Sequence, residues 1–550
     1  MGLLKALSSL AILSAIFVPF PSTILAAQSC ESLSHLKLPN TTISMAVSVP
    51  AGKFRQPDAS PANRAAINLP AFCRVVGVIR PTPDSDIKFE VWMPRQNWNR
   101  KFNGVGNGGF AGSIGYAGLA AALRADFAAA STDTGHEAGG TDAHWAMGHP
   151  EKIIDFGYRA IHLTALTGKA IVQSFYGTAP RWSYFASCSN GGRQALMEAQ
   201  RFPDDYNGII AGAPANFWTH LLAAAVWNIQ ATLDKPASDI PAEKLPAISG
   251  AVLAACDARD GVKDGILNDP RQCHFNPEAL LCKGPDSMAC LTVPQVAALK
   301  KIYAGTSDAD GRKVFPGYLP GAELGPDGWA TWITGRAPRK SLDYDFGTQF
   351  FSNMVFDNPK WNFRTFNYDA DLRLTDQKMG PILNATNPDL TTFEKDGGKL
   401  ILYHGWNDAA IPALNTVDYY RNVVARMSLR SADRFVRLYM VPGMQHCGGG
   451  PGPDSFGAYP STDADPEHSM FSALERWVEH GKAPKVIIAS KNADPSNPSS
   501  SIQMTRPLCP YPEVAKYKGS GDTNKAANFA CTVEPMRSSA NASAGAGPKP

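Results

Sequence analysis

A serine flanked by small residues is the strongest candidate for chemistry in this sequence. Ser189 lies in the run SCSNGG, after an apolar segment and before a stretch with the periodicity of a helix. The run has the form of a nucleophile elbow, G-x-S-x-G, a sharp strand-to-helix turn that exposes the serine Oγ and requires small residues around it. Gly191 meets this requirement, and Ser187 stands where glycine is usual. At the start of the helix, the backbone N–H of Asn190 is placed to stabilise an oxyanion.

A serine becomes a good nucleophile only when a base takes its proton and a third group holds that base. Asp408 follows an apolar strand in HGWND, and His446 follows the last apolar strand in VPGMQHC. The order serine, acid, histidine is that of α/β-hydrolases. His404 is a rival base, but it lies within its strand, and Asp433 is a rival acid, but it precedes its strand, away from the carboxyl ends where catalytic groups gather. We therefore predict a catalytic triad of Ser189, Asp408 and His446.

The compartment of the protein decides how its ten cysteines are interpreted. Residues 1–27 have the form of a signal peptide, with Lys5, an apolar run from Leu10 to Val18 and small residues at 26 and 27. The protein is therefore expected to be secreted or periplasmic. In such a compartment, an even number of cysteines suggests disulfides.

Spacing along the chain suggests four local disulfides and one long-range pair. The local pairs are Cys30 with Cys73, Cys256 with Cys273, Cys282 with Cys290, and Cys509 with Cys531, which leaves Cys188 and Cys447. A disulfide brings two Cα atoms to about 4.4–6.8 Å of each other. Because Cys188 precedes Ser189 and Cys447 follows His446, this last bridge would hold the nucleophile beside its base.

Strands and helices alternate on both sides of the predicted elbow. The segments with strand or strand–turn–helix patterns are 73–80, 86–93, 101–112, 127–135, 182–203, 207–215, 398–408 and 434–447. Such alternation predicts a mostly parallel sheet with helices on both faces. We therefore expect the α/β fold class, with an α/β-hydrolase core.

The alternation stops between residues 216 and 395 and then resumes. We interpret this stretch as a lid domain inserted between two strands, so that the catalytic domain comprises 28–215 and 396–536. The tail, 537–550, is rich in Ser, Ala, Gly and Pro and is expected to be disordered. Nine aromatic residues fall in 344–368. Most are expected to form the core of the lid, and some could line a slot for an aromatic acyl group.

The charge balance disfavours some classes of partner. Lys and Arg exceed Asp and Glu by 52 − 49 = +3 in 550 residues, which favours neither nucleic acid nor an acidic membrane surface. Beyond the leader, no segment is long and apolar enough for a membrane span of about 20 residues. A small substrate is therefore the expected partner, and the oligomeric state stays open.

A short acidic loop, CDARDGVKDGI, starts at Cys256. Asp257, Asp260 and Asp264 lie within eight positions, and glycines allow tight turns between them. Ca²⁺ prefers six to eight oxygen ligands from carboxylates and carbonyls. Since the spacing and the terminal glutamate of an EF-hand are missing, a solvated turn and a structural calcium site are both open interpretations.

Several motifs together resemble the tannase and feruloyl esterase family, which includes related hydrolases of aromatic diacid monoesters. They are CSNGGR, YHGWND, GMQHCGGGPG, STDTGH at 131–136 and CPYPEVAKYKGSGD at 509–522, spread over the mature chain. The resemblance implies the same triad, the Cys188–Cys447 bridge, and an oxyanion hole from the backbone of Asn190 and Gly108. It also implies a structural Ca²⁺ held by Asp257, Asp260, Asp264 and the main-chain carbonyls of Val262 and Ile266.

These features predict a secreted serine carboxylic-ester hydrolase that acts on esters of aromatic acids through an acyl-serine intermediate. The acid would be of the hydroxycinnamic, the galloyl or hydroxybenzoic, or the terephthalic type. Two other classes are the alternatives: a serine peptidase with the same triad, and a non-catalytic, calcium-stabilised binding protein.

Overall fold

The computed structural model describes most of the chain. The described residues are 28–57, 67–462, 465–494, 497 and 500–533. The predicted signal peptide, 1–27, and the predicted disordered tail, 537–550, lie outside them. Among the described residues, no helix combines the length and the apolar character needed to cross a membrane.

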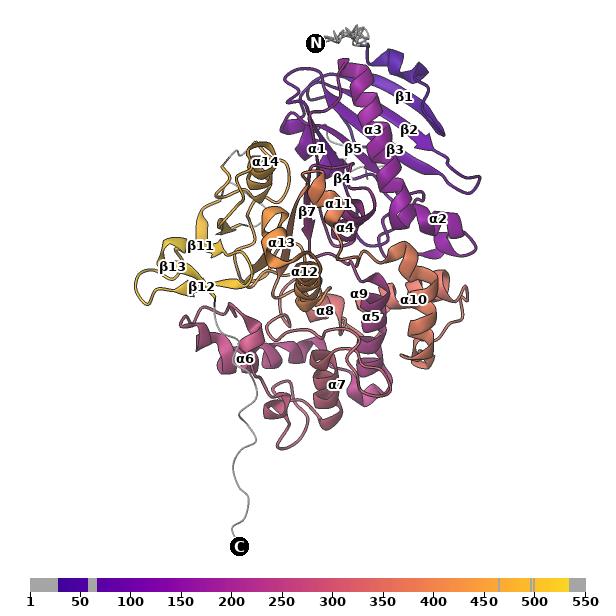
Figure 1. Ribbon diagram of the computed structural model, residues 1–550. Helices are drawn as coiled ribbons and strands as arrows, with labels where there is room; N and C mark the ends of the chain where they lie inside the picture. The colour runs from indigo at the N-terminus through magenta and orange to yellow at the C-terminus, as the bar shows by residue number, and fades with distance from the viewer. Residues whose placement is uncertain (1–27, 58–66, 463–464, 495–496, 498–499, 534–550) are drawn as a thin grey trace, which may run out of the picture.

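A nine-stranded sheet forms the centre of the molecule (Figure 1), in the order β1-β2-β3-β5-β4-β6-β7-β8-β9. The strands are β1 Thr41–Val49, β2 Phe72–Ile79, β3 Ile87–Pro94, β4 Lys101–Val105, β5 Ala128–Thr132, β6 Trp182–Cys188, β7 Gly208–Gly212, β8 Lys399–Gly405 and β9 Val436–Val441. The six strands from β5 to β9 in this order are parallel, whereas β1, β2 and β3 are antiparallel to their neighbours. The predicted α/β-hydrolase core, with a mostly parallel sheet, is confirmed.

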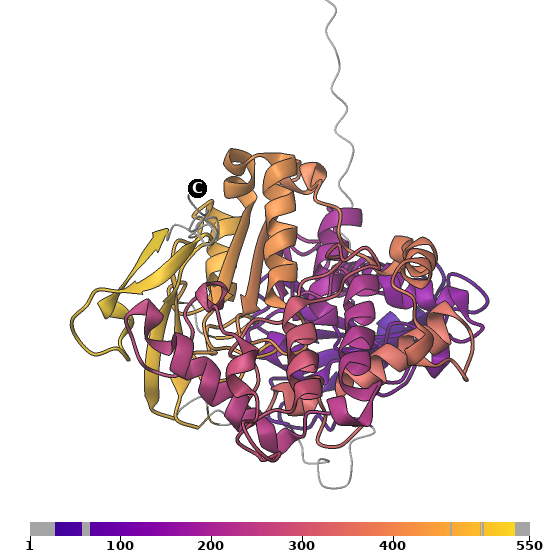
Figure 2. The same cartoon turned by 90° about the horizontal axis from the view of Figure 1, so that it is seen from below.

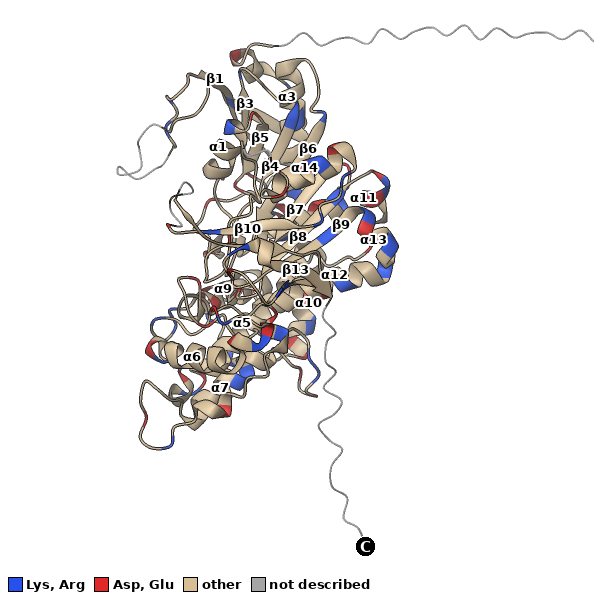
Figure 3. Ribbon diagram, turned by 90° about the vertical axis from the view of Figure 1, so that its left-hand side faces the viewer, with Lys and Arg blue, Asp and Glu red and all other residues tan. Residues whose placement is uncertain are grey.

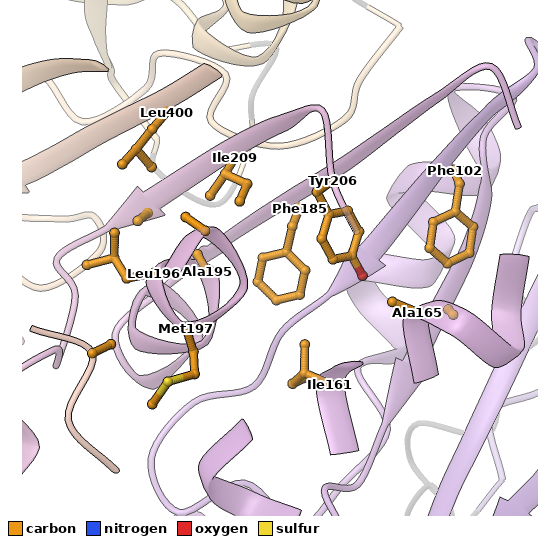
Figure 4. Packing of buried hydrophobic residues seen from close by; sticks show 14 of the residues in the cluster. Phe102, Ile161, Ala165, Phe185, Ala195, Leu196, Met197, Tyr206, Ile209 and Leu400 are labelled. Carbon is orange, nitrogen blue, oxygen red and sulfur yellow. The ribbon is translucent and has the colours of Figure 1, made fainter. Parts of the chain in front are cut away.

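Helices cover both faces of the sheet, as the alternation of strands and helices predicts. They are α1 Tyr116–Arg124, α2 Pro150–Ile154, α3 Ala160–Tyr176, α4 Asn190–Arg201, α12 Ala413–Met427, α13 Leu429–Phe435 and α14 Met470–His480. Helices α3, α4 and α12 pack on one face, and α1 and α14 on the other. Side chains of β6 alternate between the faces, as a buried strand requires. Phe185 packs among residues of α3 and α4 (Figure 4), and Tyr184 and Ala186 face the opposite side.

The chain leaves the sheet after β7 and returns in β8, its parallel neighbour. Between these strands it forms α5 Trp218–Leu233, α6 Leu245–Cys256, α7 Val293–Ala304, α8 Trp329–Trp332, α9 Leu342–Phe350, α10 Ala370–Leu383 and α11 Thr391–Lys395. Helices α5, α6 and α7 lie below the sheet in Figure 1 and in front in Figure 2. The interruption of the alternation is thus present, and the limits of a lid domain at 216–395 stay a prediction.

Two small antiparallel sheets near the C-terminus were not predicted from the sequence. They are β10 Ile487–Asn492 with β11 Ile502–Leu508, and β12 Glu513–Tyr517 with β13 Phe529–Val533. These strands pack beside the acidic loop, since Asn268 Nδ2 donates to Ala515 O at 2.6 Å and Arg506 forms an ion pair with Asp264 at 2.7 Å. The C-terminal strands therefore support a loop that lies more than 200 residues earlier in the chain.

All five predicted disulfides are present, and no described cysteine is free. They are Cys30–Cys73, Cys188–Cys447, Cys256–Cys273, Cys282–Cys290 and Cys509–Cys531. On the side of the molecule shown in Figure 3, acidic and basic residues are mixed along α11, α12 and α13. This mixing agrees with the small net charge of +3.

Candidate active site

Ser189 lies at the turn between β6 and α4, as the elbow motif predicts. Its backbone has φ 66° and ψ −127°, a strained conformation for a residue with a side chain. The turn is crowded: a Cβ on Gly191 would lie 1.9 Å from Ser187 Oγ, and a Cβ on Gly192 would lie 2.3 Å from Gly212 O. Serine fits at position 187 because Gly191 leaves room for its hydroxyl.

The three predicted triad residues meet at the carboxyl ends of β6, β8 and β9. His446 Nε2 lies 2.9 Å from Ser189 Oγ, and His446 Nδ1 lies 2.8 Å from Asp408 Oδ2. The rival acid, Asp433, lies on α13, before β9, where it forms an ion pair with Arg437 at 3.4 Å. The arrangement can therefore move a proton from the serine hydroxyl to a histidine that a carboxylate holds in place.

Asp408 is buried and held from two sides. Its Oδ1 accepts hydrogen bonds from the backbone N–H groups of Ala410 and Ile411 at 2.8 and 2.9 Å. Burial alone would raise the pKa of Asp408, but the charge of His446 and hydrogen bonds from His404 and His446 hold that pKa below its ordinary value. The carboxylate is therefore ionised at neutral pH and can stabilise a protonated histidine.

The rival base, His404, lies behind the acid. It is fully buried on β8, and its Nε2 lies 3.1 Å from Asp408 Oδ2 and 3.1 Å from Ile411 O. Its Nδ1 lies 2.7 Å from Thr416 Oγ1. A hydroxyl donated to Nδ1 places the ring proton on Nε2, where it points to the acid. His404 thus orients Asp408, a contact that the sequence did not reveal.

The Cys188–Cys447 disulfide fastens the two halves of the site together. Its Cα atoms are 6.0 Å apart, and its two cysteines are separated by 259 positions in the chain. Cys188 is the last residue of β6, next to Ser189, and Cys447 follows His446 in the loop after β9. The bridge therefore limits how far His446 can move from Ser189.

Two backbone segments lie near Ser189. Asn190 begins α4, and the first N–H groups of a helix have no partner within it. The GNGG loop is tied to α4 because Asn107 N donates to Gln194 Oε1 at 2.9 Å. Asn190 and Gly109 line the cavity beside the nucleophile, and Gly108 is the neighbouring residue in the loop. An oxyanion hole from Asn190 and Gly108 stays a prediction.

An apolar cavity of about 450 Å³, its mouth included, opens beside the nucleophile. Ser189 and His446 lie on its wall, and the inserted segment contributes residues of α5, Trp332 and Phe346. Of the nine aromatic residues in 344–368, Phe346 lines the cavity, and the others pack into the cluster around α5 and α9. The apolar and aromatic wall of this cavity suits an aromatic group.

Two residues of the cavity wall carry contacts that the sequence analysis missed. The ring of Trp332 meets that of His446 edge to face, with centroids 5.1 Å apart. Asp343 is buried on α9 and accepts a hydrogen bond from Asn228 Nδ2 at 2.8 Å. A carboxylate directly before an aromatic-rich stretch was an available signal for Asp343, and Trp332 had none.

The predicted calcium ligands form a compact loop after α6, stapled by Cys256–Cys273. The carboxylates of Asp257, Asp260 and Asp264 accept hydrogen bonds from the N–H groups of Gly265, Val262 and Ile266, respectively, at 3.0, 3.0 and 3.1 Å. Burial raises the pKa of Asp260 to about 6, so its negative charge is poorly compensated. Carboxylates and main-chain carbonyls are the oxygen donors that a hard cation prefers. Calcium at this loop stays a prediction.

Known proteins are similar to this chain over nearly its whole length. The sequence model of the family described as tannase and feruloyl esterase matches residues 73–532. The chain is 42% identical to an uncharacterized esterase of Xanthomonas campestris pv. campestris, over 100% of this chain and 98% of that protein. It is 35% identical to the mono(2-hydroxyethyl) terephthalate hydrolase of Piscinibacter sakaiensis, over 87% of each.

A solved structure extends the similarity to the fold. The crystal structure of feruloyl esterase B from Aspergillus oryzae matches with a TM-score of 0.84 and 30% identity, over 92% of this chain and 99% of that chain. The family match covers the sheet apart from β1, the inserted helices, and Ser189, Asp408 and His446. The chain therefore belongs to the tannase and feruloyl esterase family.

Proposed function

We propose that the protein is a serine carboxylic-ester hydrolase that cleaves esters of aromatic acids. The observation that carries this proposal is the hydrogen-bonded triad of Ser189, His446 and Asp408, whose serine and histidine lie on the wall of an apolar cavity. The relatives named for feruloyl and terephthalate esters support the aromatic class.

The proposed reaction runs in two steps through an acyl-serine. Ser189 Oγ attacks the ester carbonyl carbon while His446 Nε2 takes the hydroxyl proton, and backbone N–H groups stabilise the tetrahedral oxyanion. The C–O bond to the alcohol breaks, and His446 gives the proton to the departing alkoxide. Water then attacks the acyl-serine by the same route, so that the acid is released and Ser189 regains its proton.

The proposal is tested by a hydrolysis screen of aromatic esters, alkyl esters and peptides. We expect turnover of the aromatic esters and labelling of Ser189 by a fluorophosphonate probe. Cleavage of peptides in preference to esters would identify a peptidase instead. An unlabelled protein without turnover would indicate a non-catalytic binding protein.

We predict that His404→Phe lowers kcat about ten- to a hundredfold with little change in KM. The substitution removes the contact of His404 Nε2 with Asp408 Oδ2 at 3.1 Å and its hydrogen bond to Ile411 O, so the acid holds His446 less firmly. The measurement is steady-state kinetics on one aromatic ester. His404→Gln, which keeps a donor near the position of Nε2, should recover part of the loss.

A histidine–carboxylate pair outside the site provides the matched control for this prediction. His162 Nδ1 lies 2.6 Å from Asp205 Oδ2, on α3 and the loop after α4. His162→Phe should cost stability without lowering kcat. Equal kinetics for the His404 and His162 variants would contradict the role assigned to His404.

We also propose that Ca²⁺ binds the acidic loop through Asp257, Asp260, Asp264 and the carbonyls of Val262 and Ile266. Exhaustive chelation should then lower the melting temperature by about 5 °C or more, because an ion that binds the folded state alone stabilises it. Added calcium should restore the original value in a thermal unfolding experiment. Asp260→Asn should melt at a lower temperature and respond little to chelation. A wild-type melting temperature that is unchanged by chelation would remove the calcium proposal.

Export of the protein is proposed on two grounds. The first 27 residues have the pattern of a signal peptide. Five disulfides link the described part of the chain, and such bonds persist in oxidising compartments. The protein would therefore act in the periplasm or outside the cell.

A further inference from the structure

One carboxyl group interrupts the apolar wall of the cavity beside Ser189. Asp343 lies on α9, is 4% exposed, and lines the same cavity as Ser189 and His446. Its Oδ2 accepts a hydrogen bond from Asn228 Nδ2 at 2.8 Å. Within the described residues, no hydrogen bond reaches its Oδ1, and this atom is not among the fully buried atoms that lack a partner, so it is open to the cavity. The cavity thus contains a polar group that a bound molecule can pair.

The protonation state of Asp343 decides what it can bind. Burial raises the pKa of Asp343 to about 8, since the hydrogen bond from Asn228 only partly offsets the cost of desolvation. At neutral pH the side chain is therefore mostly a carboxylic acid. A carboxylic acid can both donate and accept a hydrogen bond, as a phenolic hydroxyl also does.

The rest of the wall argues against a charged acyl group. Among the described residues, those that line the cavity include no lysine or arginine, and Trp332, Phe346, Leu222 and Ile411 make much of it apolar. A carboxylate on the far side of an aromatic ring would lose its water here without gaining a cationic partner. A hydroxyl on the ring is neutral, so its transfer from water into the cavity costs less free energy.

We propose that Asp343 is a specificity-determining residue that hydrogen-bonds a phenolic hydroxyl of the acyl group. Preferred substrates are then esters of hydroxylated aromatic acids, and monoesters of aromatic diacids are poor ones. This assignment rests on the proposed ester hydrolase activity of the same cavity. The assignment specifies a substituent on the aromatic ring, which the triad of Ser189, His446 and Asp408 does not specify.

The test compares esters with and without the hydroxyl. The pairs are methyl 4-hydroxycinnamate with methyl cinnamate, and methyl 4-hydroxybenzoate with methyl benzoate. We expect the wild type to favour the hydroxylated ester in kcat/KM by about 10- to 100-fold in the pair whose ring reaches Asp343. Asp343→Leu should bring that ratio close to one, mainly through slower hydrolysis of the hydroxylated ester.

Two further variants separate recognition from folding. Asp343→Asn keeps a donor and an acceptor and should retain part of the preference. Asp345 lies on the same helix but not on the cavity wall. Asp345→Asn should therefore leave the ratio unchanged. Hydrolysis of the unsubstituted ester by Asp343→Leu at near the wild-type rate shows that this variant is folded.

The outcomes distinguish this assignment from the proposed function. If the wild type hydrolyses none of these esters, the proposed function fails, and the role of Asp343 fails with it. If aromatic esters are hydrolysed but Asp343→Leu keeps the hydroxyl preference, only the role of Asp343 is overturned. Wild-type turnover of monomethyl terephthalate as fast as that of the hydroxylated esters would also overturn it.

Discussion

Replacing Ser189 by alanine is expected to lower kcat by about 10⁵-fold or more while the protein stays folded. The substitution removes the Oγ that lies 2.9 Å from His446 Nε2, so no acyl-serine can form. The backbone N–H groups and the cavity remain, and they should leave a small residual rate above that of the reaction in water. The measurement is steady-state kinetics on an aromatic ester, with a burst-phase assay for the acyl intermediate.

A second serine of the same strand is the control for this result. Ser183 is buried on β6, where its N–H donates to Asn207 Oδ1 at 2.8 Å and its hydroxyl lies outside the cavity wall. Ser183→Ala should keep its turnover, and both variants should melt within a few degrees of the wild type. Turnover near the wild-type level in Ser189→Ala would exclude Ser189 as the nucleophile.

Replacing Cys188 and Cys447 together by alanine is expected to cost both stability and turnover. The bridge spans 259 residues, and the chain-entropy relation gives such a bridge about 5.6 kcal/mol of stabilisation, although measured values are often smaller. Without it, the loop that carries His446 is no longer fixed to the elbow that carries Ser189. A displacement of about 1 Å in a catalytic group can lower the rate about a hundredfold. We therefore expect kcat to fall about a hundredfold while KM changes little.

Another disulfide separates the two effects. Cys30–Cys73 spans 43 residues and ties the N-terminal segment to β2, away from the cavity wall. The Cys30→Ala and Cys73→Ala double variant should lose about 4 kcal/mol by the same relation but keep its kcat. Denaturant unfolding and kinetics on both double variants give the comparison. Full turnover in a folded Cys188→Ala and Cys447→Ala protein would show that the bridge serves stability alone.

Much of the fold and of the candidate site could be predicted from local sequence patterns. The elbow was predictable because a nucleophile on a tight strand-to-helix turn restricts its neighbours to small residues, and Gly191 satisfies that restriction. The strands that hold Asp408 and His446 were predictable because short apolar runs followed by polar loops mark the carboxyl ends of a parallel sheet. The pairing of Cys188 with Cys447 followed from the absence of a nearby partner for either residue.

The contacts that the inserted segment makes with the rest of the protein could not be predicted from the sequence. Periodicity indicates that a helix has an apolar face, but it does not tell which distant face that helix meets. Asp343 lies 154 positions after Ser189 in the chain, and only the packing of α9 against α5 places it on the cavity wall. The same limit applies to the C-terminal strands, whose contact with Asp264 through Arg506 spans 242 positions.

The sequence by itself predicted the class of chemistry and the residues proposed to perform it, because the candidate nucleophile, acid and base each occupy a position that local backbone geometry restricts. The tertiary structure decided how the site is supported and what can enter it. His404 lies behind Asp408, and Asp343 lies on the cavity wall, because side chains far apart in the chain meet there. These contacts depend on how the packed helices cross and on how deeply each carboxyl group is buried. Those properties belong to the folded molecule and leave little trace in the spacing of residues along the chain.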